Sequence, residues 1–235
     1  MRVLFLSNIP SPYRVDFFNE LGKYCELIVL FEKSFSSERD ASWGNYKFDN
    51  FQGIILSGIS TKTDMRFCPS VLRYLNDRSY DRIICMNFST PTGMLAIWYM
   101  KKKHIAYYLE CDGGFAKTGK GFKEWLKRKI ISQAHGYFST SKESDKYYIA
   151  YGANQEKIHR YSFSSIHESE ILQMPLSSGE KKHIRKNLNI KEEKVILTVG
   201  QFIHRKGFDI LIEAASGMDE SIGIYFVGGV PTSII

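Results

Sequence analysis

A glycine and two adjacent basic residues lie between two apolar segments near the end of the sequence. Residues 199–207 have the sequence Val-Gly-Gln-Phe-Ile-His-Arg-Lys-Gly and follow an apolar run that is typical of a strand. A glycine at a strand end lets a ligand approach the backbone. Arg205 and Lys206 precede a predicted helix, whose free N–H groups and positive end attract phosphate. The segment fits neither the Walker loop nor the dinucleotide fingerprint, so it predicts either a phosphate site or a charged turn before a helix.

Two carboxylates precede a glycine pair in the middle of the chain. Glu110 and Asp112 follow a predicted strand, and Gly113 and Gly114 come directly after them. Glycine leaves room for a ligand near the backbone, and one of the two carboxylates could hydrogen-bond ligand hydroxyls or assist proton removal. The pattern predicts either a ligand site of this kind or a turn with a solvated acidic residue.

Tyr13 and Arg14 occupy the first turn of a predicted helix that follows the first strand. Ser11 and Pro12 precede them, and a serine cap with proline at the first helical position is typical of a helix start. This turn would lie at the edge of the sheet where the strands end, so Arg14 could contact a phosphate or a sugar. Placement on the solvated surface is the alternative interpretation.

A basic segment covers residues 117–129 and contains one acidic residue, Glu124. Apolar side chains recur along it at helical spacing; they are Phe122, Trp125, Leu126 and Ile130. A basic helix with such a stripe suits an anionic membrane surface or a lipid-diphosphate acceptor. The candidate membrane-facing residues are Lys120, Lys123, Lys127 and Arg128. In the alternative interpretation, the stripe packs on a sheet and the lysines are solvated.

The order of apolar and amphipathic segments predicts the scaffold that positions these groups. We expect strands at residues 3–6, 27–31, 82–86, 105–109 and 136–139, with helices at 12–21, 91–101 and 142–151. Such alternation predicts an α/β fold with a doubly wound, mostly parallel sheet and helices on both faces. Sheets of this kind bind ligands outside the carboxyl ends of their strands. That rule points to residues 8–14, 87–91 and 110–115.

The chain divides into three parts. A first Rossmann-like domain covers residues 1–163, a polar linker with one helix covers 164–190, and residues 191–235 begin a second Rossmann-like domain. Ser177 and Glu180 form a capping-box pattern at the start of the linker helix. The last part has a single strand–helix–strand unit, which cannot bury a core alone. We therefore expect the polypeptide to be an incomplete piece of a two-domain protein.

Composition excludes several classes of protein. The 235 residues carry a formal net charge of +7, and 43% of them are hydrophobic, so the chain is globular rather than disordered. No apolar run approaches the ~20 residues of a membrane span, and the start lacks a signal-peptide core. We expect a cytoplasmic protein, attached at most to the inner face of the plasma membrane. The cysteines and histidines show no zinc-ligand spacing, and no nucleic-acid recognition motif accompanies the charge.

Several segments together resemble the family 4 retaining glycosyltransferases. Residues 199–215 are similar to the strand–loop–helix that opens the second domain of that family, whose pattern is roughly Val-Gly-Arg, four residues, then Lys-Gly. Residues 224–229 resemble the next strand and its glycine turn. In the first domain, residues 10–21 and 110–115 are similar to a branch of the family that assembles capsular and exopolysaccharides. The resemblance covers essentially the whole chain.

The resemblance implies two facing Rossmann-like domains, the GT-B arrangement, with transfer in the cleft between them. The acceptor, a surface polysaccharide or lipid-linked glycan, would bind the first domain. Its implied ligands are Tyr13, Arg14, Gly113 and Gly114, with Glu110 and Asp112 as catalytic residues. The sugar would be transferred with retention at its anomeric carbon.

The donor implied by the resemblance is a nucleotide-diphosphate sugar, taken to be a UDP-sugar, bound by the second domain. Its diphosphate would lie against Gly200, Gln201, Arg205 and Lys206. The family needs no metal or other cofactor, because positive groups and a helix end stabilise the departing diphosphate.

The sequence departs from the family pattern in two ways. Gln201 stands where arginine is common, and the chain ends before the two glutamates, seven residues apart, that hold the donor in the family. Two alternatives therefore stay open beside the glycosyltransferase. One is a non-catalytic, truncated domain that binds only an acceptor or a membrane. The other is a sugar-nucleotide epimerase on the same fold.

Overall fold

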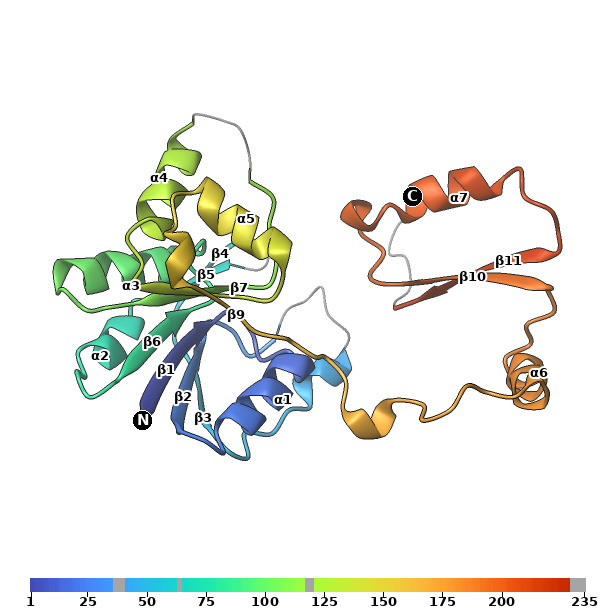
Figure 1. Cartoon of the computed structure of the whole chain (residues 1–235), viewed down its shortest axis with the longest axis horizontal. Coiled ribbons are helices and arrows are strands. Elements are labelled where there is room, and N and C mark those ends of the chain that lie inside the picture. Colours follow the sequence, from blue (N-terminus) through green and yellow to red (C-terminus); the bar gives the residue numbers. More distant parts are fainter. Residues whose placement is uncertain (36–40, 63–64, 117–120, 229–235) are drawn as a thin grey trace. The chain divides into compact units, whose positions relative to one another are not determined.

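The computed structural model of the chain describes residues 1–35, 41–62, 65–116 and 121–228 (Figure 1). The chain forms two compact units, Met1–His167 and Glu168–Ile235. Each unit is described by itself below.

The first unit is built on a seven-stranded sheet with the strand order β3-β2-β1-β6-β7-β8-β9. All of its neighbouring strands pair in parallel. The strands are β1 (Arg2–Ser7), β2 (Glu26–Phe31), β3 (Gln52–Ile55), β6 (Arg82–Cys85), β7 (Tyr108–Cys111), β8 (Gly136–Ser139) and β9 (Ile158–Arg160). The helices are α1 (Pro12–Leu21), α2 (Val71–Leu75), α3 (Pro91–Lys102), α4 (Phe122–Ile131) and α5 (Lys142–Ala150), with short 3-10 turns at Ala41–Gly44 and Gln155–Lys157. The predicted α/β fold with a parallel sheet is confirmed.

Helices cover the two faces of this sheet unequally. Successive residues of a strand point to opposite faces, so Leu4 and Leu6 join one core while Val3 and Phe5 join the other. Helices α2, α3, α4 and α5 contribute to the core that holds Leu4 and Leu6. Among the helices that the structure describes, α1 is the one that contributes to the opposite core, through Val15 and Phe18.

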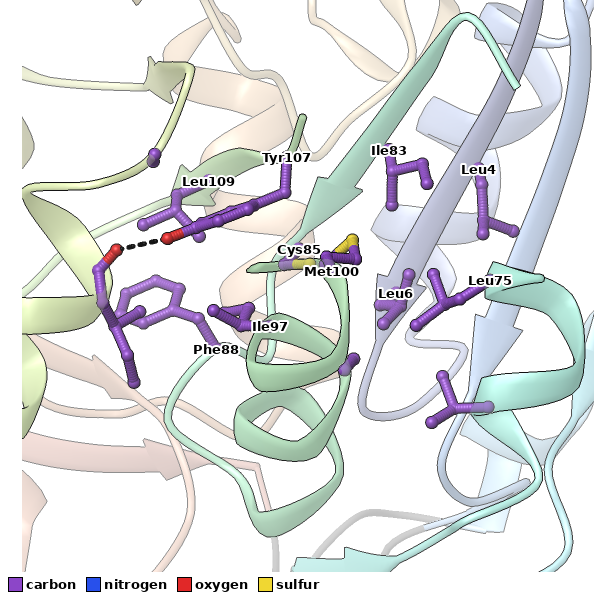
Figure 2. Packing of buried hydrophobic residues seen from close by; sticks show 14 of the residues in the cluster. Leu4, Leu6, Leu75, Ile83, Cys85, Phe88, Ile97, Met100, Tyr107 and Leu109 are labelled. Carbon is purple, nitrogen blue, oxygen red and sulfur yellow. Dashed lines mark hydrogen bonds between the residues drawn. The ribbon is translucent and has the colours of Figure 1, made fainter. Parts of the chain in front are cut away.

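The larger core is closely packed between the sheet and its helices. Figure 2 shows Leu6, Ile97 and Met100 side by side beneath the strands. The hydroxyl of Tyr107 donates a hydrogen bond of 2.8 Å to the carbonyl of Ile130 and so satisfies a buried polar group next to α4 (Figure 2). Phe88 lies in the same picture between α3 and α4.

The direction of the chain reverses at the centre of the sheet. From β1 the chain proceeds outward to β2 and β3, and it then returns to β6 and continues in the opposite direction to β9. Because parallel crossovers are right-handed, this reversal sends the helices of the two halves to opposite faces. The gap between the carboxyl ends of β1 and β6 is therefore the switch point at which such sheets bind ligands.

Two local predictions about the first unit were wrong, and one element was not predicted. The strand expected at residues 105–109 is β7, at Tyr108–Cys111, because its pairing with β8 runs from Tyr108 to Cys111. The antiparallel hairpin of β4 (Ile59–Lys62) and β5 (Met65–Phe67) was not predicted. Ser11 starts α1 through its backbone carbonyl, which accepts from the N–H groups of Arg14 and Val15, and its side chain makes no cap hydrogen bond.

The second unit contains a parallel strand pair, β10 (Lys194–Val199) and β11 (Ile222–Val227). Helix α7 (Phe208–Ala215) connects them, and a ring cluster of Phe202, Phe208 and Phe226 packs the connection onto the strands. Helix α6 (Ser178–Asn187) precedes the strands, after a 3-10 turn at Glu168–Glu170, and begins with the predicted capping box of Ser177 and Glu180. Large apolar side chains such as Leu197 and Val199 are exposed in this unit, as expected where two strands make up the sheet.

Candidate functional site

A polar cavity of about 430 Å³ opens at the switch point of the first unit. Its lining comes from the segments that follow β1 and β6 and from the end of β7, so the ends of three neighbouring strands converge on it. The predicted acceptor-site residues all line this cavity; they are Tyr13, Arg14, Glu110, Asp112, Gly113 and Gly114.

Arg14 and Glu110 form a buried ion pair in the wall of this cavity. Arg14 Nη2 lies 3.0 Å from Glu110 Oε1 and 3.2 Å from Asp112 Oδ2. Tyr161 donates its hydroxyl to the same Glu110 oxygen at 2.7 Å. The Arg14 guanidinium also lies over the ring of Phe163, 4.5 Å from its centre. The arginine is therefore held by an anion on one side and an aromatic face on the other.

The titration of these groups follows from their burial. Desolvation raises the pKa of Glu110 above its usual range, although the charge of Arg14 and the hydrogen bond from Tyr161 oppose this shift. Burial lowers the pKa of the Arg14 guanidinium. Glu110, Tyr161 and Asp112 raise it by more, so the pKa lies above its usual value. Burial, followed by the negative charge of Glu110, raises the pKa of Tyr161. Arg14 thus stays cationic and Tyr161 stays a neutral donor at any physiological pH.

The two candidate carboxylates differ in their access to a ligand. Glu110 belongs to β7 rather than to the loop after it, and its side chain is 3% exposed because it points between Arg14 and Tyr161. Asp112 lies beyond the strand end with 60% of its side chain exposed. Asp112 can therefore contact a ligand hydroxyl. Glu110 instead holds the guanidinium of Arg14 in place in the cavity wall.

Glycine and aromatic residues complete this side of the cavity. Gly114 has φ +156, and a Cβ there would lie 3.0 Å from the ring of Tyr147, whereas a Cβ on Gly113 would meet nothing within 4 Å. The ring of Tyr13 packs edge-on against Trp43 and Phe163, with centroids 5.9 Å apart in each pair. Two ring contacts thus hold Tyr13 in the cavity wall, and the backbone packs closely against Tyr147 at Gly114.

A second buried polar cluster lies on the other side of the same cavity, and two of its members, Asn87 and Thr90, belong to the predicted segment 87–91. Glu32 follows β2, and its Oε1 accepts hydrogen bonds from Asn87 Nδ2 and Thr90 Oγ1. Asn87 and Thr90 line the cavity, and Thr90 also caps α3 by accepting from the N–H of Gly93. Desolvation raises the pKa of Glu32, against these hydrogen bonds. Glu32 was not predicted, although it directly follows β2 and the same rule for strand ends could have drawn attention to it.

Two oxygen atoms of this cluster lack a hydrogen-bond partner in the described part of the chain. Glu32 Oε2 and Asn87 Oδ1 are buried without a hydrogen-bond partner among the described residues. Neither oxygen has accessible surface, so a ligand in the cavity does not reach them in this arrangement. Each is a buried acceptor left unsatisfied, which costs free energy.

The predicted phosphate segment lies in the second unit, at the end of β10. Gly200 donates its N–H to the carbonyl of Val227, and Lys206 is exposed in a 3-10 turn, His204–Lys206. Gly207 has φ +64, a left-handed conformation that glycine adopts without strain, and it starts α7. The aliphatic part of Lys206 passes close to Gly200, since a Cβ on that glycine would lie 3.4 Å from Lys206 Cε.

The other members of this segment are less well placed for an anion. Gln201 is half-buried, and the side chain of Arg205 lies outside the described part of the chain. Asp209 stands in the first turn of α7, with its Oδ2 4.0 Å from His204 Nδ1. This carboxylate opposes phosphate at the helix end, so Lys206 is the described cation on which an anion site in this loop depends.

The basic helix α4 divides its apolar stripe between the core and the surface. Leu126 and Ile130 pack into the larger core, whereas Phe122 is 75% and Trp125 52% exposed, and their rings stack on each other. Leu126 and Ile130 thus follow the interpretation in which the stripe packs inward, whereas Phe122 and Trp125 lie on the surface.

The candidate membrane-facing cations on α4 are not equivalent. Lys123 and Arg128 are exposed. Lys127 is half-buried, because its ammonium lies 3.7 Å from Glu124 and above the ring of Tyr151. Lys120 lies outside the described residues. Lys127 is therefore a paired and partly buried member of the candidate membrane-facing set.

The described part of the chain contains neither a cluster of metal ligands nor a membrane-spanning helix. Within residues 1–35, 41–62, 65–116 and 121–228, no three or more His, Cys, Asp or Glu side chains gather as metal ligands would. No helix in the same part of the chain is both long and apolar enough to cross a membrane.

Comparison with known proteins shows the fold. No protein-family model matches the sequence, and no curated protein matches it. The structure is similar to that of Anabaena HepE in complex with UDP, with a TM-score of 0.67 and 13% identity over 96% of this chain and 60% of that one. It is also similar to a glycosyltransferase from Rickettsia africae, with a TM-score of 0.59 and 10% identity over 96% and 68% of the two chains.

Epimerases share the fold as well. A putative UDP-N-acetylglucosamine 2-epimerase from Listeria monocytogenes has a TM-score of 0.59 and 11% identity, over 99% of this chain and 64% of that one. At such identities the likeness shows the Rossmann-like α/β fold alone. The chain spans about 60% of the length of HepE.

Proposed function

We propose that this chain is the acceptor-side domain, with the beginning of the donor-side domain, of a retaining family 4 glycosyltransferase of the GT-B type. The reaction moves a hexosyl group from a UDP-sugar to a surface-polysaccharide or lipid-linked glycan. The observation that carries the proposal is the polar cavity at the switch point, where Arg14, Glu110 and Asp112 converge. The solved structures with this fold, one of which holds UDP, support it at the level of fold.

The acceptor hydroxyl lies against Asp112 in this proposal. Asp112 is the exposed carboxylate of the cavity and can accept the hydroxyl hydrogen as the acceptor oxygen attacks. Arg14 and Glu110 are positioning residues, since both are buried and Arg14 contacts both carboxylates. Tyr13, Gly113 and Gly114 shape the wall against which the acceptor sugar lies.

The donor diphosphate lies on the loop of the second unit. Lys206 supplies the charge that stabilises the departing nucleotide, and Gly200 lets the diphosphate approach the backbone. Gln201 and Arg205 complete this site as neutral and cationic donors. No metal or other cofactor takes part in the proposed reaction.

The proposal places the enzyme in the cytoplasm, at the inner face of the plasma membrane. Exposed Lys123 and Arg128 face anionic lipid, with Phe122 and Trp125 at the level of the headgroups. This orientation brings the acceptor cavity close to a membrane-anchored glycan.

Binding of UDP tests the donor side. Isothermal titration calorimetry of the 235-residue chain should detect UDP binding, and Lys206→Ala should weaken it roughly tenfold or more, since it removes a charge-assisted hydrogen bond. Lys181→Ala, at an exposed position in α6 of the same unit, is the control for charge. Equal binding by both variants, or no binding to the unaltered chain, would contradict the donor site and favour the domain that binds acceptor or membrane only.

A sugar-nucleotide epimerase is the second candidate, and the epimerase neighbours favour it. An epimerase converts UDP-N-acetylglucosamine without an acceptor, whereas a transferase releases UDP only when one is present. Proton NMR of the sugar nucleotide incubated with the protein, with and without membrane extract, separates the two. Conversion to an epimer in the absence of extract would reject the transferase.

A further inference from the structure

A carboxyl group and an amide meet beside the end of β1, at the switch point of the first unit. Glu32 follows β2 and Asn87 follows β6, and both of these strands pair with β1. Asn87 Nδ2 donates a hydrogen bond to Glu32 Oε1, so the contact joins the two halves of the sheet where the direction of the chain reverses. Asn87 lines the polar cavity, whereas Glu32 is 1% exposed and supports Asn87 from the interior.

The side chains of this cluster offer more acceptors than donors. The Thr90 hydroxyl has a single hydrogen, which serves either Glu32 Oε1 or the carbonyl of Asn87. Glu32 Oε2 and Asn87 Oδ1 have no hydrogen-bond partner among the described residues. A planar carboxyl and a planar amide that share one hydrogen bond can share a second through their remaining oxygens, provided that the carboxyl carries a proton. One added hydrogen would therefore satisfy both of the orphaned atoms.

Burial is the main influence on this carboxyl. The two residues that hydrogen-bond to its side chain are uncharged. The guanidinium of Arg66 on β5 donates to the backbone carbonyl of Glu32 at 3.3 Å, and Cys68 Sγ approaches the same carbonyl at 3.8 Å. The main chain of Arg66 and the charge of Lys33 favour the ionised carboxyl, as do its two hydrogen bonds. Burial outweighs them all and raises the pKa of Glu32.

We propose that Glu32 is a neutral carboxylic acid in the folded protein at pH 7 and pairs with the Asn87 side chain at two points. Its Oε1 accepts from Asn87 Nδ2, and its Oε2 carries the proton and donates to Asn87 Oδ1. Glu32 is thus a positioning residue, which fixes Asn87 and, through the helix cap Thr90, the start of α3 in the cavity wall. The inference rests on the proposed function for the role of the cavity and deepens it, because it names the group that holds the second wall in shape.

Infrared difference spectroscopy of the 235-residue chain tests the protonation directly. At pH 7, the spectrum of the unaltered chain minus that of Glu32→Gln should contain the carbonyl band of a protonated carboxyl group, which the variant lacks. The same subtraction with Glu143→Gln, at an exposed position on α5, is the control and should contain only the bands of an ionised carboxylate. Carboxylate bands in the Glu32 difference as well would overturn the inference, because Glu32 would then be an anion.

Two substitutions of Glu32 separate the pairing from the filling of space. Glutamine can donate to Asn87 Oδ1 and accept from Asn87 Nδ2 as the neutral acid does, whereas leucine can do neither. Glu32→Gln should therefore keep the urea midpoint at pH 7 and the slow amide hydrogen exchange in the first turn of α3. Glu32→Leu should lower the midpoint and speed this exchange, because it leaves the Asn87 amide unpaired. A loss with glutamine as large as that with leucine would overturn the inference, since the charge would then be what matters.

This inference and the proposed function can fail separately. The infrared and exchange measurements involve neither UDP nor sugar transfer, so they do not depend on the comparison with Lys206→Ala. A protonated Glu32 in a chain that binds no UDP would keep the pairing and reject the donor site alone. An ionised Glu32 in a chain that binds UDP would reject the pairing and leave the donor site in place.

Discussion

Replacing Arg14 by methionine should destabilise the first unit strongly. Its guanidinium lies 3.0 Å from Glu110, and both side chains are at most 5% exposed. Removing one partner of such a pair leaves an uncompensated buried charge and costs about 3–5 kcal/mol. The contact of Arg14 with Asp112 adds little, since that carboxylate is mostly exposed. We therefore expect the free energy of unfolding to fall by about 3–5 kcal/mol at pH 8.

The companion variant separates the lost charge from lost packing. Arg14→Met combined with Glu110→Gln removes both charges, and it should recover most of the loss because a buried pair has little net value. In the single variant, Glu110 can take up a proton, and the pKa of this carboxyl is already raised by burial. The cost of Arg14→Met should therefore shrink as the pH falls from 8 toward 5.

Urea unfolding followed by tryptophan fluorescence measures these changes. Trp43, Trp98 and Trp125, the three tryptophans of the chain, all belong to the first unit, so the signal reports that unit. The slope of the transition should stay constant while its midpoint moves. A loss below about 1 kcal/mol in the single variant, or a double variant as unstable as the single one, would refute the buried-pair argument.

Three further predictions concern stability. Burial raises the pKa of Glu32, so the folded state binds more protons than the unfolded one from about pH 4.5 upward. The free energy of unfolding should therefore fall as the pH rises through the folded pKa. Glu32→Gln should make the urea midpoints between pH 4.5 and 8 less dependent on pH, and an unchanged dependence of the midpoint on pH would contradict this. Gly93→Ala places a Cβ 2.0 Å from the backbone oxygen of Asn87 and should cost about 2–3 kcal/mol in the same assay, whereas Gly113→Ala, with open space around it, should cost little; equal costs would count against the close approach. Ser177→Ala breaks the capping box of α6 and should cost about 1 kcal/mol locally, measured as faster amide hydrogen exchange in the first turn of that helix, and unaltered exchange there would show that the cap is unimportant.

Local signals in the sequence predicted most of the scaffold. Pro12 and Pro91 marked the starts of two helices, and the strand at residues 136–139 has the predicted bounds. These features depend on neighbours in the sequence. The bounds of β7 did not follow, because the apolar run that begins at Ile105 continues into the strand and only pairing with β8 decides where the strand lies.

The candidate site could be predicted only in part. The rule for parallel sheets brought the strand ends together correctly, since it follows from topology. It could not show that Arg14 and Glu110 pair, or that Glu32 meets Asn87 and Thr90, because these contacts join residues more than fifty positions apart. The partial burial of Lys127 likewise depends on Tyr151, which directly follows α5.

The central position of β1 has a consequence for the synthesis of the chain. This strand can pair with β2 soon after both are synthesised, but its other neighbour, β6, follows some eighty positions later. At the usual rate of translation, about 4–16 s pass before that partner exists. Throughout this interval an apolar strand presents one free edge, which is a template for aggregation. The nascent chain should therefore benefit from a chaperone that covers β1 during that interval, whatever the stability of the finished sheet.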